Sequence, residues 1–186
     1  NKRFMKAVGR ALGRPVRLAW LDDPRRRPMS AEHGGRPGDP LNLSDAGPLL
    51  LTTAIEAVVR AGDMQMAAFG QVHQIDKKGT IDLVTEVDVA VERMFRDLIA
   101  ERFPDHHILA EEMGGAATAP AGPCWVFDPI DGTTNFAHGL PIFCASLALE
   151  VAGVAELAAV YDPNRRELFT AERGGGAFLN GAPLLE

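Results

Sequence analysis

Apolar positions along the chain predict a first long helix. Apolar side chains recur every three or four positions over residues 51–69, a spacing typical of an amphipathic helix of about five turns. Met64 and Met66 fall within this segment and are expected to fill the core rather than to bind a ligand. The ordered part of the chain is therefore expected to begin near Leu49.

A second apolar stripe predicts a second helix. The stripe covers residues 87–99 at helical spacing, and Pro104 follows it as a stop signal. Thr85 and Asp88 stand at its start like the two members of a capping box. We therefore expect this helix to begin at about Thr85.

The rest of the chain has the pattern of strands. Short apolar or alternating runs are separated by turns rich in glycine, proline and asparagine. The predicted strands cover residues 107–110, 124–127, 143–151, 154–161, 167–171 and 177–179. Two helices followed by mostly antiparallel strands indicate an α+β fold in which the helices pack on a largely antiparallel sheet.

Charge and proline content divide the chain into two parts. Residues 1–36 hold ten Lys and Arg but only three Asp and Glu, whereas the remainder carries a net charge of −13. Closely spaced prolines interrupt every periodic pattern in the first part. We therefore expect a disordered basic extension over residues 1–48, with a targeting peptide or a nucleic-acid-binding arm as alternatives, and a folded body over residues 49–186. The acidic body would repel a phosphate backbone, so nucleic acid is not its expected partner.

The same composition argues for a protein of the cytoplasm. The most apolar stretch, residues 143–161, contains Glu150 and Glu156, and each acid near a bilayer centre would cost roughly 2.5–3.5 kcal/mol. Cys124 and Cys144 form no CxxC pair and too few bridges for a disulfide scaffold. A cytoplasmic protein without a membrane partner is the prediction.

The strongest candidate for a functional site is the run Asp128–Pro129–Ile130–Asp131, which directly follows a predicted buried strand. The proline restricts its own φ and keeps Asp128 extended, so the turn can direct both carboxylates at one point with the Ile130 carbonyl between them. Oxygen ligands of this kind suit a hard cation such as Mg²⁺. The alternative is an ordinary turn, because Asp, Pro and Gly are also the usual residues of turns.

Neighbouring residues extend this candidate site. Gly132 leaves room for a ligand beside the backbone, and Thr133 and Thr134 can open a helix whose free N–H groups hold a phosphate. Glu111 follows another predicted strand and is the preferred further ligand, with Glu112 as a candidate for a second metal or for supporting the first; the alternative for this pair is a solvated acid pair in a loop. Two carboxylates 4 Å apart repel by about 4 kcal/mol at an effective dielectric of 20. Acids that converge here would therefore converge around a cation.

Three blocks of the sequence, in this order and spacing, resemble the inositol monophosphatase family. They are residues 77–88 (KKGTIDLVTEVD), 108–112 (ILAEE) and 125–139 (WVFDPIDGTTNFAHG), followed by similar strands at 160–163 and 173–181. The resemblance covers residues 49–186. It implies the N-terminal portion of a layered αβαβα sugar-phosphatase fold, Mg²⁺-dependent and Li⁺-sensitive hydrolysis of a small phosphorylated substrate, and a homodimer.

The resemblance also assigns roles to residues. The positions that match the family's metal ligands are Glu111, Asp128, Asp131 and the carbonyl of Ile130. The positions that match its substrate site are Glu111, Ile130, Asp131, Gly132 and Thr133. In catalysis, Thr133 paired with Asp88 would orient and deprotonate the attacking water, with Glu111 as the third catalytic residue.

Two departures leave alternatives open. Family members continue into a second half with a Trp-Asp motif, which is absent here because neither Trp20 nor Trp125 precedes an Asp. The chain is therefore expected to be the N-terminal half of such an enzyme. The alternatives are a 3′-phosphonucleotide phosphatase, a histidinol-phosphate phosphatase, or a truncated, non-catalytic metal-binding or regulatory module. Thr134–Asn135 favours the inositol group over the two other phosphatases.

Overall fold

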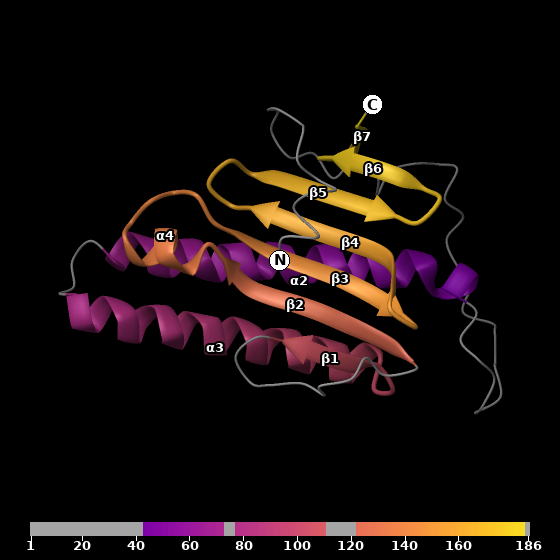
Figure 1. The fold of residues 1–186 in the computed structure, drawn as a ribbon, viewed down its shortest axis with the longest axis horizontal. Helices are drawn as coiled ribbons and strands as arrows, with labels where there is room; N and C mark the ends of the chain where they lie inside the picture. The colour runs from indigo at the N-terminus through magenta and orange to yellow at the C-terminus, as the bar shows by residue number, and fades with distance from the viewer. Residues whose placement is uncertain (1–42, 73–76, 111–121, 185–186) are drawn as a thin grey trace.

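The computed structural model describes residues 43–72, 77–110 and 122–184. Two long helices, α2 (Leu43–Val72) and α3 (Lys77–Arg102), precede the strands, and a short helix, α4 (Thr133–Ala137), lies between the second and third strand (Figure 1). The strands are β1 (His107–Ala110), β2 (Pro123–Asp131), β3 (Cys144–Val151), β4 (Val154–Asp162), β5 (Glu167–Glu172), β6 (Gly176–Leu179) and β7 (Ala182–Pro183).

The strands form one sheet in the order β1 to β7, so that every strand pairs with its neighbour along the chain. β1 and β2 are parallel and all other pairs are antiparallel. This confirms the predicted α+β class and the largely antiparallel sheet. The predicted strands after residue 140 agree with β3 to β6 to within one residue at each end, because short turns rich in glycine, proline or asparagine bound them.

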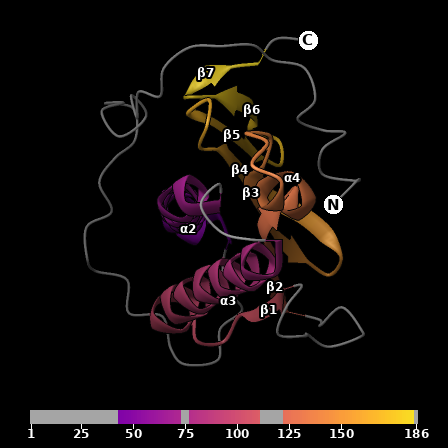
Figure 2. The same ribbon diagram turned by 90° about the vertical axis from the view of Figure 1, so that its left-hand side faces the viewer.

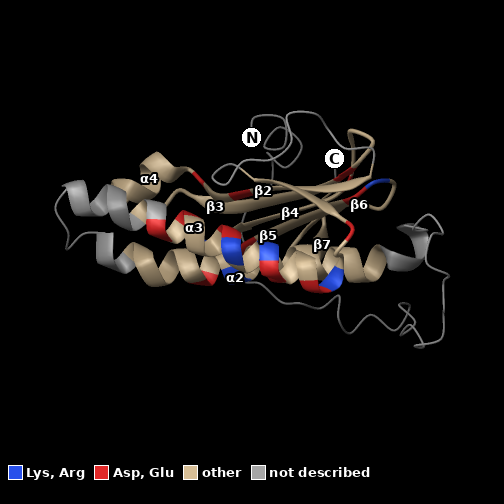
Figure 3. Cartoon of the chain, turned by 90° about the horizontal axis from the view of Figure 1, so that it is seen from below, with Lys and Arg blue, Asp and Glu red and all other residues tan. Residues whose placement is uncertain are grey.

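The helices α2 and α3 lie side by side and cover one face of the sheet (Figures 2 and 3). Helix α2 contacts β3 and β4, whereas α3 contacts β2 and the short helix α4. Between α3 and β2, the Phe95 ring lies 4.3 Å from the Phe127 ring and 6.3 Å from the Trp125 ring, measured between centroids. The core is therefore the layer of apolar side chains between the helices and the sheet.

Both helices start earlier than the apolar pattern predicted. Helix α2 begins at Leu43 and contains Pro48, which removes only one intrahelical hydrogen bond near the start. Among the described side chains of α2, Leu49 is 47% exposed and burial starts at Leu50. Apolar periodicity marks only the buried part of a helix and therefore placed the start too late. The division into residues 1–48 and 49–186 stays a prediction.

The capping box predicted for the second helix is wrong. Helix α3 begins at Lys77, eight residues before Thr85, so Thr85 and Asp88 lie inside the helix. Asp88 is buried, which is not the environment of a solvated cap. The apolar stripe again showed only the packed part of the helix, which begins at Val84 among the described side chains.

Both cysteines are free thiols buried in the sheet, Cys124 on β2 and Cys144 at the start of β3. Within the described ranges, no helix is both long enough and apolar enough to cross a membrane. The cytoplasmic location stays a prediction.

Candidate functional site

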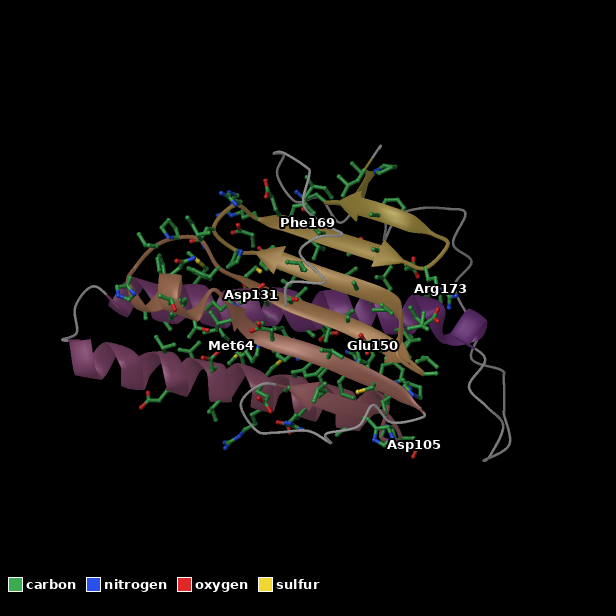
Figure 4. The ribbon with its side chains drawn as sticks, viewed as in Figure 1. Met64, Asp105, Asp131, Glu150, Phe169 and Arg173 are labelled. Atoms are coloured by element: carbon green, nitrogen blue, oxygen red, sulfur yellow. The ribbon has the colours of Figure 1, made fainter. Side chains whose placement is uncertain are left out.

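The Asp128–Asp131 turn lies at a bulge in strand β2. Regular pairing with β3 runs as far as Asp128, opposite Ser146, and resumes at Asp131, opposite Cys144. Because β2 has one residue more than β3 over this interval, the strand bends and its side chains change direction. Asp131 lies at the end of the sheet near α4, opposite to the end where Asp105, Glu150 and Arg173 lie (Figure 4).

The thiol of Cys144 lies beside an acid of this region. Its Sγ lies 4.0 Å from Oδ2 of Asp131. Burial, and then the negative charges of Asp131, Asp128 and Asp162, raise the pKa of Cys144 to about 12. The thiol is therefore neutral at physiological pH. Oxygen ligands such as the Asp128 and Asp131 carboxylates suit a divalent cation.

Asp162 was not predicted as part of this site, and its own contacts indicate a structural role. Its Oδ1 accepts hydrogen bonds from the N–H groups of Asn164, at 2.9 Å, and Arg165, at 3.1 Å. The Arg165 guanidinium lies 3.2 Å from the other oxygen. Asp162 therefore closes the turn between β4 and β5 and already has a cationic partner.

Hydrogen bonds within the Asp128 turn arrange its oxygen atoms. The Ile130 N–H donates to Asp128 Oδ1 at 3.2 Å, and the Ile130 carbonyl accepts from the Thr133 hydroxyl at 2.9 Å. A carbonyl oxygen has two lone pairs, so this bond leaves the Ile130 carbonyl able to bind a cation. Asp128, Asp131 and this carbonyl fit the oxygen ligands that the sequence predicts for Mg²⁺.

Helix α4 begins at Thr133, as predicted, and Gly132 is its N-cap. Gly132 has φ 104°, and a Cβ there would lie 2.9 Å from the Ile142 carbonyl oxygen. The chain's own backbone thus requires a glycine at this position, whatever ligand lies beside it. Binding of phosphate by the Gly132 and Thr133 amides stays a prediction.

Two further predicted contacts remain predictions. Asp88 is buried on α3, which contacts α4, but the hydroxyl of Thr133 donates to Ile130. The pairing of Thr133 with Asp88 is thus a hypothesis. Glu111 and Glu112 lie outside the described residues. Within the described residues, no group of three or more His, Cys, Asp or Glu side chains has the arrangement of a metal site.

One residue of the site went unpredicted. Gln65 on α2 is fully buried and donates a hydrogen bond from Nε2 to the carbonyl oxygen of Pro129 at 2.6 Å. Met66, expected in the core, is instead 40% exposed, whereas Met64 packs partly against the core. The sequence could have shown that Gln65 is buried. It lies three residues after Gly62 and four before Phe69, and therefore on the predicted apolar face of the helix.

Similar proteins define the class of this fold. A solved inositol monophosphatase from Anabaena sp. superposes with a TM-score of 0.63 at 36% identity, covering 74% of this chain and 49% of that one. The inositol monophosphatase of Thermotoga maritima gives a TM-score of 0.61 at 37% identity, covering 73% and 52%. The fold is therefore that of inositol monophosphatases.

Comparison of the sequence with known proteins indicates the same family as the comparison of structures. The model of the inositol monophosphatase family matches residues 49–185. An inositol-1-monophosphatase from Synechocystis is 44% identical over 135 residues, 72% of this chain and 47% of its own length. The Nus factor SuhB of Escherichia coli K12 is 42% identical over 134 residues, 71% and 50% respectively.

The chain belongs to the inositol monophosphatase family. It spans about half the length of the curated relatives that it matches. Members of this family are phosphatases and are generally metal-dependent.

Proposed function

We propose that this chain carries the metal-binding half of a phosphatase site that hydrolyses a small phosphate monoester, inositol monophosphate or a related sugar phosphate, with Mg²⁺. The observation that carries the proposal is the position of Asp128 and Asp131 at the two ends of the β2 bulge, inside the segment that matches the family. Lithium sensitivity, a homodimer and a cytoplasmic location are parts of the same proposal.

The proposed ligands are Asp128, Asp131, the carbonyl of Ile130 and, from outside the described residues, Glu111. A divalent cation held there would supply positive charge for the phosphate and Lewis acidity for a water nucleophile. The turn between β2 and α4 contributes to orientation, because its hydrogen bonds hold the Ile130 carbonyl and the Asp128 carboxylate in place.

The remaining residues would handle the phosphate and the proton. Thr133 and Asp88 would orient the attacking water and accept its proton, with Glu111 as the third catalytic residue. The backbone N–H groups of Gly132 and Thr133, at the start of α4, would hold the phosphate oxygens. Because these residues would act on the metal, the water and the phosphate, substrate specificity would depend on other residues.

A regulatory role is the second candidate. It is favoured by the similarity to the Nus factor SuhB of Escherichia coli, which is as high as the similarity to several named phosphatases. A regulatory module would bind metal without hydrolysing a phosphate ester. The two proposals therefore differ in turnover rather than in metal affinity.

Asp131→Asn tests the proposal. Phosphate release from inositol monophosphate, 3′-phosphoadenosine 5′-phosphate and histidinol phosphate is measured with Mg²⁺, with and without Li⁺, alongside calorimetric Mg²⁺ binding. Loss of a direct ligand should lower affinity and turnover by more than about 100-fold, beyond the 10–100-fold typical of outer-shell changes. Asp97→Asn, at an exposed acid on α3, is the matched control. Undiminished Mg²⁺ binding by Asp131→Asn would contradict the proposed site, and binding without turnover by the unmodified chain would favour the regulatory module.

A further inference from the structure

Helix α2 contacts the Asp128 turn through one buried polar side chain. Gln65 has no exposed surface, and its Nε2 donates to the Pro129 carbonyl oxygen across 64 residues of sequence at 2.6 Å. Its other polar atom, Oε1, has no hydrogen-bond partner within the described part of the chain. A buried carboxamide that is satisfied on one side only is a poor choice for stability alone. The contact with Pro129 therefore suggests a different reason for a glutamine here.

The position of Gln65 is set by residues on both sides of it along the helix. Gly62 lies against the ring of Tyr161, so closely that a Cβ on this glycine would be 2.5 Å from Cδ1 of the ring. One turn after Gln65, Phe69 packs on Phe136 of α4 and on Phe143 beside β3, at centroid distances of 5.5 and 4.9 Å. Helix α2 thus packs on Tyr161 of β4 one turn before Gln65, and on Phe136 and Phe143 one turn after it. The carboxamide of Gln65 lies between these contacts.

The hydrogen bond from Gln65 reaches a peptide unit that also holds Asp128. The Pro129 carbonyl and the Ile130 N–H belong to the same planar peptide group. Gln65 binds the carbonyl end at 2.6 Å, and the N–H end donates to Asp128 Oδ1 at 3.2 Å. Rotation of this peptide would break both bonds at once. A fixed peptide plane therefore fixes the direction of the Asp128 carboxylate.

We propose that Gln65 is a positioning residue, which orients the Asp128 carboxylate for metal binding by holding the Pro129–Ile130 peptide. This inference rests on the proposed function, because it concerns the same metal site. Gln65 touches neither substrate nor metal in this scheme. It acts through the peptide.

Gln65→Met tests the proposal at nearly constant volume. The change removes the donor to Pro129 together with the unpartnered Oε1, so the effect on thermal unfolding should be small. Thr53→Val is the matched control, because Thr53 is also fully buried on α2 but accepts a hydrogen bond from Arg102 instead of contacting the turn. Two readouts are used on the whole chain. Mn²⁺ affinity is measured by paramagnetic resonance of the free ion, and amide hydrogen exchange across residues 124–136 is measured by mass spectrometry without metal.

The expected result is a fall in Mn²⁺ affinity of about 10–100-fold for Gln65→Met, the range of outer-shell changes at metal sites. Exchange of the Ile130 amide should accelerate in the same variant, while Thr53→Val changes neither quantity. Unchanged exchange in Gln65→Met would overturn the proposal, whatever the metal affinity. A chain that binds no Mn²⁺ would overturn the proposed function instead, and hydrogen exchange would still decide whether Gln65 holds the turn.

Discussion

The described part of the chain contains two Asp-Pro turns, one in β2 at Asp128 and one at the end of β4 at Asp162. In both, the aspartate accepts a hydrogen bond from the N–H group two residues later, at 3.2 Å in the first turn and 2.9 Å in the second. The residue three positions after the aspartate differs. It is Asp131 in the first turn and Arg165 in the second, where the guanidinium pairs with Asp162.

The difference between the turns shows what separates a structural turn from a candidate metal site. Each aspartate organises its own backbone in the same way, so the Asp-Pro sequence alone is only turn chemistry. A second acid at the third position gives the Asp128 turn two carboxylates that could bind a cation. Arginine at that position provides the balancing charge from the chain itself.

The largest expected effect comes from making the first turn like the second. Asp131→Arg would place a guanidinium three residues after Asp128, which should pair with that carboxylate and occupy the cation position. Mg²⁺ binding measured by calorimetry should fall by more than about 100-fold, beyond the range for outer-shell changes. Thermal unfolding should remain cooperative. Retained Mg²⁺ affinity would show that the two turns do not differ in the way described.

Asp162→Ala should affect stability instead of metal binding. The change removes the acceptor of two backbone N–H groups and the partner of Arg165. Hydrogen bonds to a charged group contribute about 1.5–3 kcal/mol, and we expect a loss of unfolding free energy of that size in denaturant titrations. Mg²⁺ affinity should change by less than about threefold, because Asp162 acts on the site only through its distant charge. Arg165→Ala, at an exposed side chain, is the milder control, with an expected loss of about 1 kcal/mol or less. A fall in Mg²⁺ affinity as large as that of Asp131→Arg would make Asp162 a ligand.

The smallest expected effect concerns a half-buried polar group outside both turns, His106. Burial lowers its pKa from 6.5, with an opposing contribution from Asp105 and a further lowering by His107. Its Nδ1 accepts a hydrogen bond from the indole N–H of Trp125 at 3.0 Å, which requires the neutral ring. The unfolded chain therefore binds this proton more readily, and the unfolding free energy should fall as the pH drops below 6.5 and level off below the folded pKa.

Titration of a single proton limits the change of unfolding free energy to about 1.4 kcal/mol per pH unit, and partial exposure of the His106 ring reduces it further. His106→Gln can keep an acceptor for Trp125 without a titrating group, so denaturant titrations at pH 7.5 and 5.5 should show a smaller difference than in the unmodified chain. An equal difference in both proteins would assign the pH dependence to other groups. Mg²⁺ affinity at pH 7.5 should be the same in both.

Much of the fold was predictable because it depends on local patterns. The strands β3 to β6 were placed closely by alternation and turn residues, and the two helices by their apolar stripes. The helix starts were missed because apolar periodicity marks only the part of a helix that is buried in the core. The start of α4 at Thr133 was predicted correctly from one short run of sequence, and the same run supplied Asp128, Ile130 and Asp131 as candidate ligands, which stay a prediction.

The amino-acid sequence by itself determined the elements, their mostly antiparallel order and the acids available to a cation, because hydrophobic periodicity and turn chemistry act over a few residues. Only the tertiary structure decided that the Asp131 carboxylate lies 4.0 Å from the Cys144 thiol and that Gln65 binds the peptide between Asp128 and Asp131. Residues 64 positions apart meet there because α2 docks on the sheet. The orientation of that helix is set by the packing of Gly62 and Phe69 against other elements, which no local pattern encodes.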